Sequence, residues 1–258
     1  MHIQPRILRR HLVMVAAAAL AVLGSMLSFT SAATADGTDT TADGPTYQMP
    51  AVGECHNIAW KNYDKMSDTT AAVDCTTAHN AVVIATAQMP ANTDWTRDSA
   101  DIAKALTKTC APAVKSTLGQ SYRVIAKTAY TWSDWIPTKA QRDHGASWIR
   151  CDMNLAGNQK LLTLRKNLAL KDTSIPRRLK ACLMVTAKGS FSRVSCSGKF
   201  NWTISRVFVV PSKVYPTHAK FLRYAGSHCP TKSWWATWRP KITWKAGDHT
   251  LVCYRHAS

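Results

Sequence analysis

Two stretches of the chain show the same order of hydrophobic and polar positions. In the first, the apolar residues 82–84 (Val-Val-Ile) are followed by Pro90, and in the second, residues 207–209 (Val-Phe-Val) are followed by Pro211. Short runs rich in β-branched residues and closed by proline are typical of strands, because proline cannot donate to a ladder. The pattern therefore predicts one Cys-bearing strand in each stretch, which contains Cys75 or Cys196 and is ended by the proline.

A helical spacing follows each of these strands. Apolar residues recur every four positions, which places them on one helix face; they are Ile102, Leu106, Cys110 and Val114 in the first stretch and Phe221, Ala225 and Cys229 in the second. Thr217 is expected to cap the second helix, and Pro112 and Pro230 are expected to end the two helices. Gly145 and Gly247 then predict a turn into a final strand.

The N-terminal pattern is that of a secretory leader. Arg6, Arg9 and Arg10 precede an apolar run over residues 12–27, and small residues follow as far as Ala35. The run is shorter than the ~20 residues of a spanning helix, so we expect cleavage near Ala35. A retained signal anchor is the alternative. Residues 36–50, rich in Thr, Asp, Ala and Gly, are expected to form a disordered spacer.

The cysteines support export and a repeated architecture. Eight cysteines form two sets of four, Cys55, Cys75, Cys110 and Cys151, then Cys182, Cys196, Cys229 and Cys253. An even number of cysteines in an exported chain indicates disulfides. Zinc is the competing interpretation, but no Cys-x-x-Cys spacing occurs. Three pairings are open within each set, and we favour Cys55–Cys75, Cys110–Cys151, Cys182–Cys196 and Cys229–Cys253.

These patterns predict an α+β fold built as two tandem small disulfide-stapled repeats, each a short β-sheet with one packed helix. The repeats are assigned to residues 51–153 and 177–258, and residues 154–176 form the linker. The leucines of the linker are expected to pack on the second repeat.

Several segments of the first repeat resemble a known family. They are residues 52–55 (Val-Gly-Glu-Cys), residues 73–79 (Val-Asp-Cys-Thr-Thr-Ala-His), Cys110, and residues 145–151 from the glycine to the cysteine. The chain resembles the septum formation domain of exported actinobacterial proteins, with the second repeat as a divergent copy. The resemblance implies an exported envelope protein with an α+β fold, and it implies no particular reaction.

The chain departs from the family around His79. Ala78 and Val82 stand where the family usually has Pro and Glu, and Phe200 and Thr203 occupy the positions that would match the His and Glu in the second repeat. Any chemistry that this His and Glu perform in the family would therefore be absent from this chain.

Few residues suggest catalysis. His79 is the best single candidate, and we expect a structural role in which its ring bonds to a backbone carbonyl. Asp134, which lies between Trp132 and Trp135, is a second candidate, for which packing is the favoured interpretation. No Gly-x-Ser-x-Gly, His-Glu-x-x-His or phosphate-binding loop occurs. We therefore expect no catalytic residue, cofactor or metal, and an envelope hydrolase remains an alternative.

Charge is concentrated in the second half of the chain. Residues 159–258 contain 19 Lys and Arg against 2 acidic residues, a net charge of +17, whereas residues 51–158 contain 11 against 10, a net charge of +1. A net charge this large and of one sign favours binding to a polyanionic partner over a role in solubility alone.

Aromatic and basic residues alternate near the C-terminus, where rings can stack on sugars or bases while cations hold anionic groups. The candidate binding residues are Lys232, Trp234, Trp238, Arg239, Lys241 and Lys245, and Trp235 and Trp244 are expected to lie inside. We predict a non-catalytic protein, secreted or on the extracellular face of the cell envelope, that binds anionic envelope polymers and is linked to septum formation. The alternative is an extracellular protein that binds nucleic acid or an anionic membrane surface. No membrane-spanning segment is expected after the leader.

Overall fold

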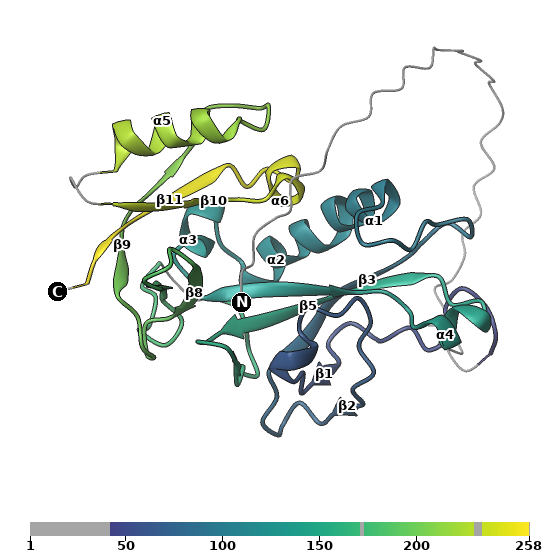
Figure 1. Cartoon of the computed structure of the whole chain (residues 1–258). Helices are drawn as coiled ribbons and strands as arrows, with labels where there is room; N and C mark the ends of the chain where they lie inside the picture. Colours follow the sequence, from purple (N-terminus) through teal and green to yellow (C-terminus); the bar gives the residue numbers. More distant parts are fainter. Residues whose placement is uncertain (1–41, 171–172, 230–233, 258) are drawn as a thin grey trace, which may run out of the picture.

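The computed structural model describes residues 42–170, 173–229 and 234–257, and it contains two antiparallel β-sheets (Figure 1). The first sheet has the order β2-β1-β3-β5-β4, with β6 paired to β5; its strands are β1 (Cys55–His56), β2 (Ala72–Val73), β3 (Ala81–Gln88), β4 (Tyr130–Trp135), β5 (Trp148–Ala156) and β6 (Leu161–Leu162). The second has the order β10-β11-β9-β7-β8; its strands are β7 (Ala181–Val185), β8 (Phe191–Ser195), β9 (Trp202–Val209), β10 (Trp235–Trp238) and β11 (Thr250–His256). The predicted leader lies outside the described residues.

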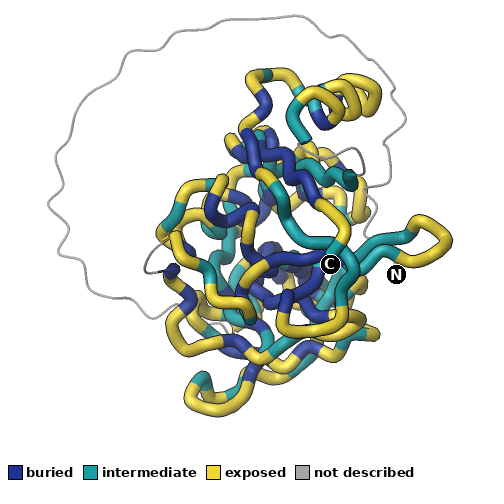
Figure 2. Tube along the Cα trace, turned by 90° about the vertical axis from the view of Figure 1, so that its left-hand side faces the viewer, coloured by how far each residue is buried: buried dark blue, intermediate teal, exposed yellow. Residues whose placement is uncertain are grey.

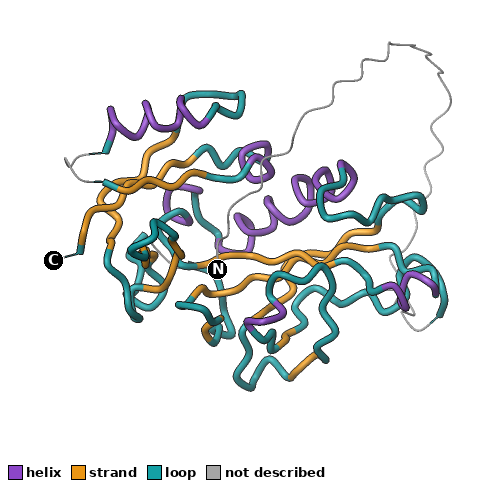
Figure 3. Tube along the Cα trace, in the orientation of Figure 1, coloured by secondary structure: helices purple, strands orange, loops and turns teal. Residues whose placement is uncertain are grey.

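The longer helices lie on one side of the sheets, the upper side in Figure 3. The first sheet carries α1 (Ala100–Ala105), the π-helical turn η2 (Leu106–Cys110) and α2 (Ala111–Leu118), and the second carries α5 (His218–His228). Four short helical segments complete the fold: η1 (Trp60–Asn62), α3 (Tyr122–Ile125), α4 (Lys139–Asp143) and α6 (Lys241–Lys245). The α+β class is therefore confirmed.

The two sheets have matching strand orders. The order is β2-β1-β3-β5-β4 in the first sheet and, from the matching edge, β8-β7-β9-β11-β10 in the second, so β3 and β9 are the middle strands and β4 and β10 are edges. The long helical segment follows the third strand in both cases. The two sheets thus share one connectivity, β6 aside.

β5 shows how sequence alternation positions the core. Its nine residues are all buried, and they alternate between an apolar set and a set containing Arg150, Asp152 and Asn154. Side chains alternate across a strand. The apolar set joins the core beneath α1 and α2, so the polar set lies buried on the opposite face. Figure 2 shows buried segments in the interior of the trace and exposed segments around them.

The four disulfides join the pairs that the sequence favours: Cys55–Cys75, Cys110–Cys151, Cys182–Cys196 and Cys229–Cys253. Each bond links residues of the same half of the chain, and Cα–Cα distances run from 5.2 to 5.5 Å. Each sheet unit is therefore cross-linked separately, which restricts its unfolded state.

The helix predictions are confirmed in part. The Thr217 side chain accepts from the Lys220 N–H at the start of α5, as expected. Pro112, however, does not end the first helix. It lies at the first turn of α2, after η2 has interrupted the α-helical pattern, where a missing N–H breaks no bond of the α-helix. Pro230 lies outside the described residues.

Three segments differ from the sequence expectation. Each Cys-bearing strand is instead two strands, because Cys75 and Cys196 lie in the connections after β2 and β8. The linker leucines pack on the first unit: β6 pairs with β5, and Leu164, Leu168 and Leu170 join the core that contains Leu118 and Met153.

Part of the expected spacer is also ordered. The N–H of Gly44 donates to the carbonyl of His144 at 2.8 Å, and the indole of Trp148 donates to the carbonyl of Tyr47 at 3.0 Å. Gly145, at φ 87°, leaves room for this approach, because a Cβ there would lie 3.1 Å from the Gly44 backbone. Residues 43–48 therefore pack against α4 and β5.

The two units meet around α3. The Arg193 side chain of β8 donates from Nη2 to the carbonyl oxygens of Ala126, at 3.2 Å, and of Thr128. Burial lowers the pKa of Arg193 to about 10, so it remains charged at neutral pH. A buried guanidinium thus satisfies the carbonyl end of a helix in the other unit, where a positive charge is favoured.

Candidate functional site

The residues of the predicted basic and aromatic cluster lie on different sides of the second sheet and on α6. Trp234 and Trp238 belong to the aromatic cluster beneath α5, where the Trp238 ring stacks on Phe221 with a centroid distance of 4.6 Å. Arg239, just beyond β10, bonds to Thr250, whose side chain points away from that cluster because it precedes Leu251 in β11. The six predicted residues therefore do not form one continuous binding surface.

Arg239 is already paired. Its Nε lies 2.7 Å from Asp248 Oδ2 and donates to Thr250 Oγ1 at 3.1 Å, and its side chain is 17% exposed. This partly buried ion pair neutralises the charge that the sequence analysis assigned to ligand binding.

The other members of the cluster have different surroundings. Lys241 and Lys245 are exposed on α6, and Trp244 between them is buried, as expected. Trp235 is half-buried rather than enclosed. Lys232 lies outside the described residues.

The exposed cations of the second half form no salt bridge within the described residues. Of the described residues after 158, Asp248 is the one acid, and it is buried against Arg239. The exposed cations of this half number fourteen: Lys160, Arg165, Lys166, Arg177, Lys180, Lys188, Lys199, Arg206, Lys213, Lys220, Arg223, Lys241, Lys245 and Arg255. Their charge is left for counterions or for a ligand.

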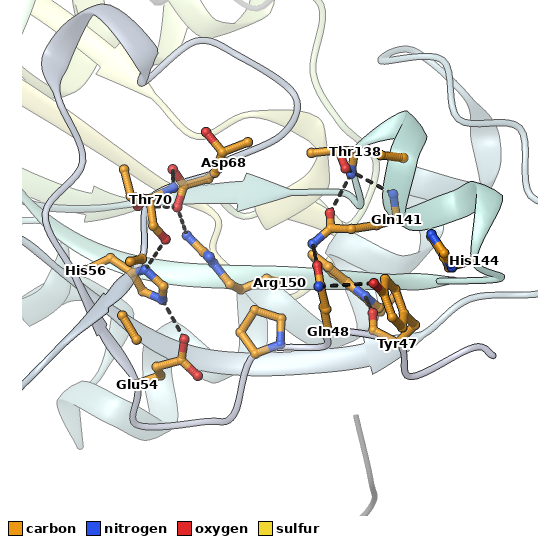
Figure 4. Close-up of a pocket in the computed structure, with 16 residues that line it drawn as sticks. Tyr47, Gln48, Glu54, His56, Asp68, Thr70, Thr138, Gln141, His144 and Arg150 are labelled. Atoms are coloured by element: carbon orange, nitrogen blue, oxygen red, sulfur yellow. Dashed lines mark hydrogen bonds and ion pairs between the residues drawn. The ribbon is translucent and has the colours of Figure 1, made fainter. Parts of the chain in front are cut away.

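A cleft of about 590 Å³ opens in the first unit (Figure 4). One wall is α4 with the N-terminal segment, where the rings of Tyr47 and His144 stack at 4.8 Å and Gln141 donates to the side chain of Gln48 at 3.1 Å. The other wall is the loop around residues 68–72, and the floor includes Arg150. The cleft is therefore a concave feature with both polar and apolar lining, built by distant parts of the chain.

Arg150 is the centre of a buried charge network beneath the cleft. Its Nη2 lies 2.6 Å from Asp68 Oδ2 and 2.7 Å from Asp152 Oδ2, and the Trp135 indole donates to Asp152 at 2.8 Å. Burial disfavours the guanidinium charge, but the two carboxylates raise the pKa of Arg150 above its usual value. The network holds the floor of the cleft rigid through mutually satisfied partners.

The pKa values of the Asp152 and Asp68 carboxyl groups shift in opposite directions. Burial raises the pKa of Asp152, against the opposing effects of Arg150 and Trp135. Burial alone would also raise the pKa of Asp68, but hydrogen bonds from Thr70 and Arg150 lower it below the usual range.

His56 pairs with Glu54 at the edge of this network. Its Nδ1 lies 3.1 Å from the carbonyl oxygen of Thr70, so this nitrogen donates. Its Nε2 lies 3.1 Å from Glu54 Oε1, but the geometry is that of an ion-pair contact and not of a well-directed hydrogen bond. Neither partner is a hydroxyl or thiol, so the arrangement differs from that of an activated nucleophile.

The two catalytic candidates from the sequence are structurally engaged. His79 is buried, with Nδ1 2.9 Å from the carbonyl of Thr77, which is the expected bond to a backbone carbonyl. Trp135 is buried in the packing next to Asp134, whose pKa is raised by burial against the effect of Arg97. Every cysteine is in a disulfide, and the described residues contain no group of three or more His, Cys, Asp or Glu that could hold a metal ion.

The family model described as Septum formation matches residues 52–253. The chain belongs to the Septum formation family. The matched region of this family member runs through both sheets and contains all eight cysteines. Comparison with curated proteins and with solved structures gives no match. In the described part of the chain, no helix has the length and apolarity needed to cross a membrane.

Sequence reasoning missed the cleft. The alternation of Arg150, Asp152 and Asn154 with apolar residues in β5 is a visible signal of a strand with one polar face. The partners of that face, Asp68 and Trp135, lie 82 and 17 residues away from Arg150 and Asp152 respectively, so the pattern alone does not reveal that the face is buried.

Proposed function

We propose that this member of the Septum formation family is an exported, non-catalytic protein that binds an anionic polymer of the cell envelope through its second sheet unit. The supporting observation is the set of eleven exposed cations after residue 176, none of which forms a salt bridge within the described part of the chain. A polyanion that replaces their counterions gains free energy from counterion release. Membership of the family supports a place for this binding in septum formation.

The two sheets are, in this proposal, tandem copies of one unit. Their shared strand order and the disulfides within each half support this interpretation. The copies differ in charge, so the first serves as a near-neutral support and the second as the binding unit. The predicted leader and the disulfides support a location outside the cytoplasm.

The proposal is tested by binding to inorganic polyphosphate over a salt series, using the whole mature chain. The test variant is Lys241→Gln/Lys245→Gln, and the matched control is Lys104→Gln/Lys108→Gln, which removes two exposed lysines at the same spacing from the first unit. The test variant should flatten the plot of log affinity against log salt by roughly 1.5, using the slope per contact measured on nucleic acids.

The control variant should leave that slope unchanged. Equal slopes for both variants, or an affinity of the wild type that does not depend on salt, would contradict the proposal.

A further inference from the structure

An aromatic cluster lies on the face of the second sheet opposite α5. The Phe191 and Trp235 rings meet edge to face at 5.6 Å, Trp202 lies 6.3 Å from Trp235, and His256 lies 5.0 Å from Trp202. These four residues, from β8, β9, β10 and β11, are called the aromatic platform below. Sequence reasoning did not identify it, because its rings come from four separate strands.

The strand register explains why the rings meet. Trp202 lies directly opposite His256, and Trp235 opposite Tyr254, in antiparallel pairs. Residues two apart on a strand share a face, so His256 and Tyr254 bring both tryptophans to one side. The platform is thus a consequence of the pairing and does not depend on a loop.

The platform is only partly covered. Of the residues in its apolar cluster, Ala126 of the first unit is the one described member outside the second sheet. Phe191, Trp202 and Trp235 remain half-buried and His256 is exposed. Large rings that their neighbours hold in place and that are partly exposed can stack on a flat ligand with little further loss of side-chain freedom. This lowers the entropic cost of binding.

The charges of this half of the chain favour an acidic ligand. Lys188 is exposed in the turn between β7 and β8, before Phe191, whereas Arg255 alternates with His256 in β11 and therefore faces the other side of the sheet. Since Asp248 is buried and paired, no exposed acid of the described second half opposes an anionic ligand there.

We infer that the aromatic platform is a stacking site for the sugar rings of an acidic glycan, a conclusion that rests on the proposed polymer binding and names its chemistry. Sugar rings would stack on Trp202 and Trp235 through their C–H faces, while Lys188, in the turn before Phe191, would contact the acidic groups. A polyanion without rings would use the cations alone. Nucleobases also stack on aromatic rings, but an exported protein points to glycans.

The test compares three probes in moderate salt: oligogalacturonate, inorganic polyphosphate and single-stranded DNA. Trp202→Leu and Trp235→Leu should each weaken oligogalacturonate binding about tenfold and leave polyphosphate binding unchanged. Trp60→Leu is the matched control, because Trp60 is also a half-buried tryptophan stacked on a ring, Tyr63, but in the first unit. It should change neither affinity.

His256→Ala provides a milder variant, since this exposed residue lies at the end of β11 and its loss should leave the fold intact. It should weaken oligogalacturonate binding several-fold. The inference is overturned if the platform variants bind oligogalacturonate as the wild type does, if they lose polyphosphate binding equally, or if they affect DNA more than the glycan. Failure of the wild type to bind any probe would instead overturn the proposed function itself.

Discussion

Replacing Asp152 with Asn should strongly destabilise the first unit. The Asp152 carboxylate is fully buried. It accepts hydrogen bonds from Arg150 Nε at 2.9 Å, from Arg150 Nη2 at 2.7 Å and from Trp135 Nε1 at 2.8 Å. Asn is almost the same size, but it has one oxygen, and its NH₂ group would face another donor. The substitution also leaves the guanidinium with Asp68 as its remaining acidic partner.

The expected cost follows from the burial of the pair. Removing one member of a buried ion pair typically costs about 3–5 kcal/mol, and each kcal/mol shifts Tm by roughly 2–4 °C for a chain of this size. Asp152→Asn should therefore lower Tm by about 10 °C in a thermal melt followed by near-ultraviolet circular dichroism.

Asp143→Asn is the matched control. Asp143 pairs with Lys139 on the surface of α4, where the two side chains are 59% and 81% exposed. Exposed pairs of this kind contribute little, so Tm should change by no more than roughly 2 °C. Equal small shifts for both variants would refute the reasoning, because they would mean that the buried network does not hold the first unit together.

Three further outcomes are expected. Because the folded-state pKa of Asp68 is lowered, its carboxylate stabilises the fold above about pH 4, and this stabilisation is lost as the pH falls through the lower folded-state pKa. The Tm difference between wild type and Asp68→Asn should therefore shrink below about pH 4. A Tm difference that stays constant with pH would contradict this. Arg193→Met should cost about 2–3 kcal/mol in urea unfolding, because carbonyl groups at the junction lose their donor; no change would show that the junction does not depend on it. Removing Cys110–Cys151, with a separation of 41, should cost about 1 kcal/mol more than removing Cys182–Cys196, with a separation of 14; a smaller cost for the longer loop would contradict the entropic argument.

The sequence carries much of the fold because its periodic signals are local. The cap at Thr217, the turns at Gly145 and Gly247, and the sequence order of the cysteines each depend on residues close together in the chain. The favoured disulfide pairs are present, but the sequence separated only the two sets of four and left three pairings open within each.

The site was less accessible because it depends on register. Arg239 bonds to Thr250 on the side of the sheet away from Trp238, and the partner that neutralises Arg239 is Asp248, which lies beyond α6. The position of the linker leucines likewise depends on the pairing of β6 with β5. Composition identified the charged half correctly, but it could not show which of its cations are free.

The most direct test of polymer binding is a pull-down of the mature protein on isolated cell-wall material, before and after chemical removal of its acidic polymer. The account predicts retention on the intact wall, loss of retention after the acidic polymer is removed, and no effect of nuclease treatment. Equal retention on stripped wall, or release by nuclease, would contradict it.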